Sequence, residues 1–350
     1  MNTMIRVPEA ELEAGILAAL RAAGAEEGCA AAATRAMMHA SRCGVDSHGA
    51  RLTAHYAAML RSGRVNPVPR FDIRRTGDAT ALLHADHGLG HAAAYSGMEL
   101  ACELARQCGI GAVGIVGSSH YGAAGAYALA GAEAGFIALC TTNSDAVVAP
   151  HDGRARFHGT NPIAAAAPVP NQKPWLLDMA TSSIPLNRVH LYRTLGLALA
   201  DGVAADGSGE PTTDPNATEM LIPLGGTGYG FKGAGLAGLV TLLSAVLVGG
   251  SLDSRCIPMT GTDDIATPRN IGHFCLAIDP VRFVGREAYD ALITQYLADL
   301  RGAPARPGKM ILAPGDREWA VEAERRRDGI PIDPETAAFL KLRKPHVSDL

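Results

Sequence analysis

Residues 109–116 have the sequence Gly-Ile-Gly-Ala-Val-Gly-Ile-Val, and this stretch limits the kind of α/β fold that the chain can form. Gly109, Gly111 and Gly114 match the G-x-G-x-x-G pattern of a βαβ dinucleotide-binding unit, which needs a strand before the glycines and a helix after them. Here the pattern predicts a helix before the glycines, over 92–108, and a strand after them. The order is reversed, so the glycines indicate a turn from helix to strand and argue against a Rossmann unit.

The same pattern recurs at Gly228, Gly230 and Gly233, where an apolar segment precedes the glycines and a helix follows them. Residues 249–264 after that helix are loop-like, so the second strand of a βαβ unit is missing. The stretch therefore predicts a glycine-rich loop whose backbone N–H groups can approach a ligand closely, with Lys232 available to bind an anion.

The two ends of the chain differ in pattern from its middle. The first 65 residues are helical in pattern, with apolar side chains at Leu12, Ile16 and Leu20 that repeat at a period of about 3.6. From residue 71 onward, short strands alternate with helices. Further strands are expected at 136–142, 162–167, 175–178, 274–278 and 309–313, and further helices at 121–134, 286–300 and from 316. We expect one domain of residues 1–70 and 255–350 and a second of residues 71–254.

Composition favours a compact enzyme, with 47% apolar and 19% charged residues in a chain of 350 that can form about two domains. The net charge of −4 is small, and the sequence has no stripe of basic residues that could follow a phosphate backbone. Nucleic acid is therefore not an expected partner. The longest apolar stretch, 234–248, is shorter than the ~20 residues that cross a membrane. We expect a buried helix there and no membrane partner.

Seven cysteines are dispersed along the chain without a C-x-x-C pair. An odd, scattered set is typical of reduced thiols, so a cytoplasmic location is expected. Residues 1–13 are charged and contain no apolar core of a signal peptide, which supports the same expectation.

One polar turn, Asp46-Ser47-His48-Gly49-Ala50-Arg51, lies between two expected helices. Reduction of a carbonyl by hydride needs a proton donor, a hydrogen bond that orients the developing alkoxide, and a cation for a substrate carboxylate. His48, Ser47 and Arg51 are residues of these types. The alternative is a serine that caps a helix beside an incidental histidine and a surface arginine.

A second polar turn, Ser118-Ser119-His120-Tyr121-Gly122, lies where an expected strand ends and a helix begins. Ligands of α/β proteins bind at such strand ends. A helix N-terminus disfavours a charged imidazole, so His120 could act as a neutral hydrogen-bonding group or as an acid–base catalyst. A capping turn with a structural histidine is the alternative.

His84, Asp86, His87 and His91 form an H-x-D-H-x-x-x-H sequence that could bind a metal. His87 and His91 would share a face only in a helix, and two glycines between them indicate a turn instead. We therefore expect no metal site, and a metal-dependent hydrolase that uses this cluster remains the alternative function. Such a hydrolase would lose activity in the presence of chelators.

Four segments, taken together, resemble the malate/L-lactate dehydrogenase family of the second type, which is unrelated to the classical lactate dehydrogenases. The family includes ureidoglycolate, sulfolactate and diketogulonate dehydrogenases and Δ1-piperideine-2-carboxylate reductase. The segments are Gly-Val-Asp-Ser-His-Gly at 44–49, Ser-His-Tyr-Gly-Ala-Ala-Gly at 119–125, Gly-Thr-Asn-Pro at 159–162 and Leu-Asp-Met-Ala-Thr-Ser at 177–182. With weaker matches they follow the family order from about residue 5 to 340, and the ordered set is specific.

The resemblance implies a mixed α/β fold. Its cofactor domain is not of the Rossmann type but contains a mixed, largely antiparallel sheet, and a helical domain is formed by the two chain ends. It implies an NAD- or NADP-dependent enzyme, a homodimer or larger, that interconverts a small 2-oxo acid or cyclic 2-imino acid and its 2-hydroxy or amino counterpart. The substrate is thus a small carboxylate.

The resemblance also assigns roles to residues. Ser47 and His48 would face the reacting carbon with His120 nearby, and either histidine could donate the proton. The residues expected to border the dinucleotide are His120, Thr160, Asp178, Met179, Ala180, Thr181, Arg188, Lys232, Gly315 and Asp316.

The chain departs from the family pattern at two places. Many relatives carry an arginine five positions after the serine, where this chain has Leu52, so Arg51 becomes the expected carboxylate anchor. Relatives often have Gly-Lys where Asn187-Arg188 stands here. The particular 2-oxo or imino acid and the choice between NAD and NADP stay open, and a noncatalytic oligomeric binding protein is a third alternative.

Overall fold

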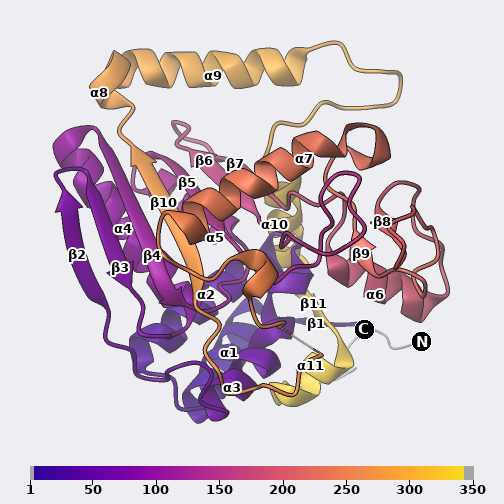
Figure 1. The fold of residues 1–350 in the computed structure, drawn as a ribbon. Helices are drawn as coiled ribbons and strands as arrows, with labels where there is room; N and C mark the ends of the chain where they lie inside the picture. Colours follow the sequence, from indigo (N-terminus) through magenta and orange to yellow (C-terminus); the bar gives the residue numbers. More distant parts are fainter. Residues whose placement is uncertain (1–3, 260, 343–350) are drawn as a thin grey trace, which may run out of the picture.

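The computed structural model describes residues 4–259 and 261–342, and at its centre lies a seven-stranded sheet (Figure 1). In spatial order the strands are β2 (Asp72–Gly77), β3 (Thr80–His84), β4 (Ile110–Ser118), β10 (Ile271–Ile278), β5 (Ile137–Thr142), β6 (Ile163–Ala167) and β7 (Trp175–Met179). Strands β3 and β4 are parallel, and the other neighbours in this sheet are antiparallel. The expected mixed, largely antiparallel sheet is confirmed.

The reversed order of helix, glycines and strand at 109–116 is also confirmed. Helix α4 (Gly90–Cys108) ends at Gly109, which has the left-handed φ of 85°, and β4 follows at once. A Cβ on Gly111 would lie 2.0 Å from the carbonyl oxygen of Ala101, so only glycine lets the strand pack this closely on the helix. The glycines serve packing between α4 and β4.

Helices cover both faces of the sheet. Helices α4 and α5 (Gly125–Glu133) pack on one face and form the main core with it. On the other face lie α7 (Gly226–Thr241) and the π-helical turn that follows it (Leu242–Val246). Ser244 in this turn hydrogen bonds Thr141 of β5, with the two hydroxyl oxygens 2.8 Å apart.

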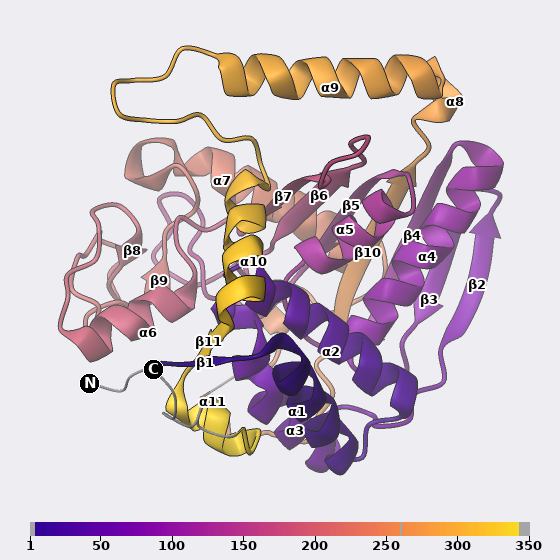
Figure 2. The same ribbon diagram turned by 180° about the vertical axis from the view of Figure 1, so that it is seen from behind.

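The two chain ends build a second core beside the sheet (Figure 2). Strand β1 (Ile5–Val7) pairs antiparallel with β11 (Ile330–Ile332). The helices of this part are α1 (Glu9–Ala22), α2 (Glu27–Arg42), α3 (Thr53–Arg61), α10 (Asp316–Asp328) and α11 (Pro334–Phe339). The expected domain limits stay a proposal, with one correction. The expected limits place strand β10 in the terminal domain. It is instead a central strand of the sheet, because it pairs with both β4 and β5.

The remaining elements lie at the periphery. They are α6 (Leu186–Leu195), β8 (Ala204–Ala205), β9 (Met220–Leu221), α8 (Val281–Val284) and α9 (Arg286–Gly302). The stretch expected as a strand at 309–313 is irregular. Directly after it, the Pro314 carbonyl oxygen accepts a backbone hydrogen bond from Leu176 N–H. The helix expected from 121 begins at Gly125, because the preceding residues form the turn around His120.

Two expectations for the glycine-rich region were wrong. The expected loop is mostly helical, since α7 begins at Gly226 and is interrupted only by a non-helical Tyr229. The following apolar stretch is not buried. Its helix rests on the sheet by one side and exposes Leu239, Leu242, Val246 and Leu247. Residues 226–246 are long and apolar enough to cross a membrane by length and composition alone, which is weak evidence because helices of water-soluble proteins also meet this criterion.

Candidate active site

The turn that carries Ser47 and His48 is held from two sides. It is a short 3-10 helix (Asp46–His48) between α2 and α3, and the Ser47 hydroxyl lies 2.8 Å from Nδ1 of His48. Arg325 of α10 donates to Asp46 (Nη2–Oδ2 2.9 Å), so the C-terminal part of the chain fixes the turn. A Cβ on Gly49 would lie 2.2 Å from Oγ of Ser41, so this position requires glycine.

His120 lies just beyond the end of β4 and meets the same turn. The rings of His48 and His120 stack with 5.9 Å between their centroids. Oη of Tyr56, on α3, lies 2.7 Å from Nδ1 of His120. The structure thus brings Ser47, His48 and His120 together and adds Tyr56, which the sequence reasoning missed. Its place in the first turn of α3, nine residues after Ser47, was the available signal, since this helix follows the polar turn closely along the chain.

Burial sets the protonation of this group. Burial, followed by the positive charges nearby, lowers the pKa of His120 well below its usual value, and burial also lowers the pKa of His48. Burial raises the pKa of Tyr56, so its hydroxyl stays protonated. When that hydroxyl donates to Nδ1 of the neutral His120, the ring hydrogen is on Nε2. A neutral imidazole in this tautomer can donate a hydrogen bond to a substrate oxygen.

A small pocket lies beside His120 and Tyr56. Its lining also includes Arg64 and Arg269, which are 3% and 6% exposed. Arg51 does not line this pocket, and its side chain is exposed on the turn before α3. The cations next to His120 are therefore two buried arginines that the sequence reasoning did not single out.

Several residues expected near a dinucleotide lie on adjoining segments. Thr181 donates from its N–H and its hydroxyl to the carbonyl oxygen of Thr160, at 2.9 and 3.1 Å. Leu224 N–H donates to the Thr181 carbonyl oxygen at 2.9 Å, and a Cβ on Gly233 would lie 2.4 Å from Leu224 N. The end of β7 therefore adjoins the start of α7, where Lys232 is located.

This arrangement suits an anionic group. Lys232 is exposed over the rings of Tyr229 and Phe231, and no ion pair with it occurs within residues 4–259 and 261–342. A Cβ on Gly228 would meet no atom within 4 Å, so the first turn of α7 is open. Helix N-termini and an unpaired lysine are features that bind phosphate groups. The residues present thus fit the pyrophosphate of a dinucleotide.

The other residues expected to border the cofactor differ in their burial and in their contacts. Asp178 accepts a hydrogen bond from Gly125 N–H at 2.9 Å at the start of α5, and burial raises its pKa to about 6. Met179 and Ala180 follow it at the half-buried end of β7, while Arg188 is exposed on α6. Asp316 is paired with Arg301 of α9 (Nη2–Oδ1 2.7 Å) directly after Gly315, which gives it a structural role.

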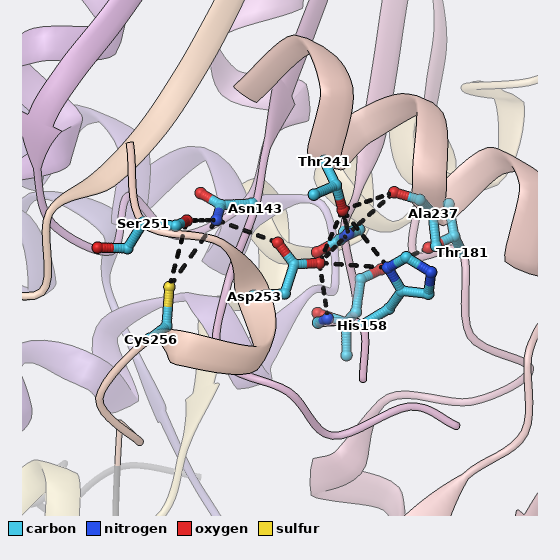
Figure 3. Close-up of polar contacts among 11 residues, drawn as sticks. Asn143, His158, Thr181, Ala237, Thr241, Ser251, Asp253 and Cys256 are labelled. Atoms are coloured by element: carbon cyan, nitrogen blue, oxygen red, sulfur yellow. Dashed lines mark hydrogen bonds and ion pairs between the residues drawn. The ribbon is translucent and has the colours of Figure 1, made fainter. Parts of the chain in front are cut away.

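A hydrogen-bonded cluster centred on Asp253 holds the segment that contains Thr160 (Figure 3). The Asp253 carboxylate is 2% exposed and accepts from Asn161 Nδ2 at 2.6 Å, Thr241 Oγ1 at 2.9 Å and Asn143 Nδ2 at 3.1 Å. Gly159 N–H also donates to it, at 3.1 Å. The cluster fastens the 159–161 segment to the end of α7. No local pattern marked Asp253, because its partners are far away in the sequence.

The histidine-rich segment does not form a metal centre. In the described part of the chain, no group of three histidine, cysteine, aspartate or glutamate residues could hold a metal ion. His91 is buried on α4 against the ring of Tyr56, with 4.6 Å between centroids. Asp86 instead accepts from Asn66 Nδ2 at 2.9 Å. The hydrolase alternative is therefore not favoured.

The fold and the site define a class of protein: a non-Rossmann oxidoreductase that acts on small carboxylates. A family model for malate/L-lactate dehydrogenase matches residues 7–341, and the chain belongs to this family. It is 33% identical to an NAD⁺-dependent ureidoglycolate dehydrogenase of Escherichia coli, over 89% of this chain and 87% of that protein. It is 34% identical to an NADP⁺-dependent (2R)-3-sulfolactate dehydrogenase of Chromohalobacter salexigens, over 93% of each. The solved structure of malate dehydrogenase from Pyrococcus horikoshii is similar, with a TM-score of 0.87, 33% identity and coverage of 97% of each chain.

Proposed function

We propose that the protein is an NAD(P)-dependent oxidoreductase that interconverts a small 2-oxo or cyclic 2-imino acid and its 2-hydroxy or amino counterpart. The observation that carries this proposal is the hydrogen-bonded Tyr56–His120 pair in a pocket that also contains two buried arginines. The pair can supply a proton and the arginines can bind a carboxylate. Relatives whose names state NAD⁺ and NADP⁺ support the cofactor class.

The nicotinamide cofactor, when bound, supplies the hydride. Lys232 and the first turn of α7 would hold its phosphates, and Thr160, Thr181 and the half-buried Met179 and Ala180 would border it. Asp178 would support this site indirectly, because its carboxylate accepts a hydrogen bond from Gly125 N–H at the start of α5.

The proton follows a short path. His120 donates its Nε2 proton to the substrate oxygen, and Tyr56 passes its hydroxyl proton to Nδ1, so the ring stays neutral. The tyrosinate left by this step takes a proton from solvent before the next turnover. His48 is hydrogen bonded to Ser47 and stacks near His120, and it would help to hold the His120 ring in position. Burial keeps His120 and Tyr56 neutral before the substrate binds. Neither group therefore carries a negative charge that would repel the substrate carboxylate.

A screen of substrates tests the function directly. The protein is mixed with NADH or NADPH and a panel of 2-oxo acids and cyclic imines, and the loss of absorbance at the nicotinamide band is followed. We expect oxidation with at least one substrate, and activity that survives exhaustive chelation because no ligand set for a metal is present among the described residues. A protein that neither binds nor oxidises either cofactor would contradict the proposal and favour the noncatalytic alternative.

We further propose that the protein is a cytoplasmic homodimer. Its seven cysteines are free thiols, as a reducing compartment maintains them. Helix α7 and the turn after it expose Leu239, Leu242, Val246 and Leu247 on one side. Patches of this kind in water-soluble proteins mark interfaces, and an identical patch on a second copy is a matching apolar partner.

The dimer proposal predicts a change in mass. Leu242→Glu together with Val246→Glu places two charges in the apolar face, and burying them in an interface would be costly. We expect sedimentation equilibrium to show twice the chain mass for the wild type and the single-chain mass for the double variant. Leu195→Glu on α6, at a similarly exposed leucine, is the control and should leave the mass unchanged. A wild-type protein of single-chain mass at micromolar concentration would contradict the proposal.

A further inference from the structure

Two arginines from distant parts of the chain converge on the pocket that contains His120. Arg64 follows α3, and Arg269 lies two residues before β10. Both line the pocket together with Tyr56 and His120, and both are more than nine-tenths buried. A guanidinium is buried at a considerable cost in hydration, so such a pair needs strong compensating contacts.

The contacts of these arginines hold them in place but leave donors free. Nη2 of Arg64 donates to the Asp264 carbonyl oxygen and lies 3.4 Å from its carboxylate. Arg269 donates from Nε to the Ile257 carbonyl oxygen at 2.8 Å and is ion-paired through Nη2 with Asp145. Within the described residues, Nε of Arg64 is buried without any hydrogen-bond partner. A buried donor of this kind is destabilising until an acceptor reaches it.

The chemistry of the substrate determines where a carboxylate anchor must lie. In a 2-oxo acid the carboxylate is bonded directly to the reacting carbon, whose oxygen meets His120. The anchor must therefore line the same pocket as His120. Arg64 and Arg269 meet this condition and the exposed Arg51 does not. The neighbouring Leu52 packs against the core of the N-terminal helices.

We propose that Arg64 and Arg269 bind the carboxylate of the substrate, with the unpartnered Nε of Arg64 as a principal donor. This inference rests on the proposed function, because it assigns the anchor of that same site. Arg64 is the more informative residue, since Arg269 has more of its donors engaged by the protein. The competing role for Arg64 is structural: it would only tie the loop around Asp264 to the end of α3.

Kinetics of Arg64 variants test the proposal. For the best 2-oxo acid in the screen, we expect Arg64→Gln to raise KM at least ten-fold while kcat changes much less, because the lost contact is present before and during the reaction. Arg64→Lys should fall between this variant and the wild type, since lysine keeps the charge but loses the planar fork. Arg61→Gln removes an exposed arginine three residues away and is the matched control, with kinetics like the wild type.

A binding experiment separates anchoring from structure. Oxalate, a small planar dicarboxylate, is titrated into the protein with NADH present, and the affinities for oxalate and for NADH are both measured. We expect Arg64→Gln to weaken oxalate at least ten-fold and to leave NADH affinity unchanged. Adding guanidinium chloride to Arg64→Ala should restore part of the oxalate affinity, and an NADH affinity that stays at the wild-type value would show that the fold of the variant is intact.

The outcomes for the two proposals can be told apart. An active wild type with an Arg64→Gln variant that keeps wild-type KM and oxalate affinity would overturn the anchor while leaving the function intact. The anchor would also be overturned if Arg51→Ala, and not Arg64→Gln, raised KM and weakened oxalate binding. Failure of the proposed function would show as a wild type that does not bind NADH. In that case oxalate is titrated into the protein without NADH. A weaker affinity for oxalate in Arg64→Gln than in the wild type would support the anchor, and an unchanged affinity would overturn it.

Discussion

Replacing His120 with alanine is expected to lower kcat by about 10²–10⁴-fold, the usual effect of removing a positioned proton donor. The imidazole contacts the Tyr56 hydroxyl and also lines the pocket that contains Arg64 and Arg269. Alanine removes the donor without adding bulk, so the fold should persist. Steady-state rates with saturating NADH or NADPH measure the effect, and circular dichroism checks that the variant is folded.

Three further variants make this result specific. Tyr56→Phe removes only the hydroxyl that hydrogen bonds Nδ1 of His120, and we expect a smaller loss of kcat. His48→Ala should also lose less activity than His120→Ala, because His48 contacts the donor by stacking rather than by a hydrogen bond. His190→Ala, at an exposed histidine of α6, is the control. If His48→Ala proves far more damaging than His120→Ala, the donor is His48, the other histidine that the sequence left open.

The second large effect is expected at Asp253. Asp253→Ala should lower the free energy of unfolding by about 3–5 kcal/mol, because it breaks a buried charged network and leaves its donors without an acceptor. Asn161 Nδ2, Thr241 Oγ1 and Gly159 N–H would all lose this partner. Denaturant unfolding measures the change. Asp253→Asn keeps one acceptor oxygen and should lose less, and Asp201→Ala, at an exposed aspartate, should be neutral.

The contribution of Asp253 should also depend on pH. Burial alone would raise the pKa of its carboxyl, but hydrogen bonds from His158, Asn161, Gly159 and Thr241 together hold it below the ordinary value. A lowered pKa in the folded state means that the stabilisation is present above the unfolded pKa of about 3.9 and is lost as the pH falls through the folded pKa. The stability gap between wild type and Asp253→Asn should therefore shrink on acidification below about pH 4. A gap that stays constant down to pH 2 would show that the carboxylate charge is not what holds the cluster.

Local sequence order determined much of the architecture. The glycines at 109, 111 and 114 follow a helix and precede a strand, and that order alone excluded a Rossmann unit at this place. The turns around Ser47 and His120 were also recognisable, because a short polar run between two regular elements depends on neighbouring residues only. The ordered motifs indicated the family, which the comparison over residues 7–341 confirms.

Only the tertiary structure decided which side chains meet. Tyr56 and His120 are 64 residues apart, and Arg64 and Asp264 are 200 apart, yet each pair is in contact. Strand β10 comes late in the chain but pairs with β4 and β5 in the middle of the sheet, and Asp253, shortly before it, thereby reaches Asn161. Periodicity and turn chemistry report on residues that are neighbours along the chain. Contacts such as these arise from packing between distant segments, where the burial of apolar faces brings polar groups together, and no local pattern encodes that pairing.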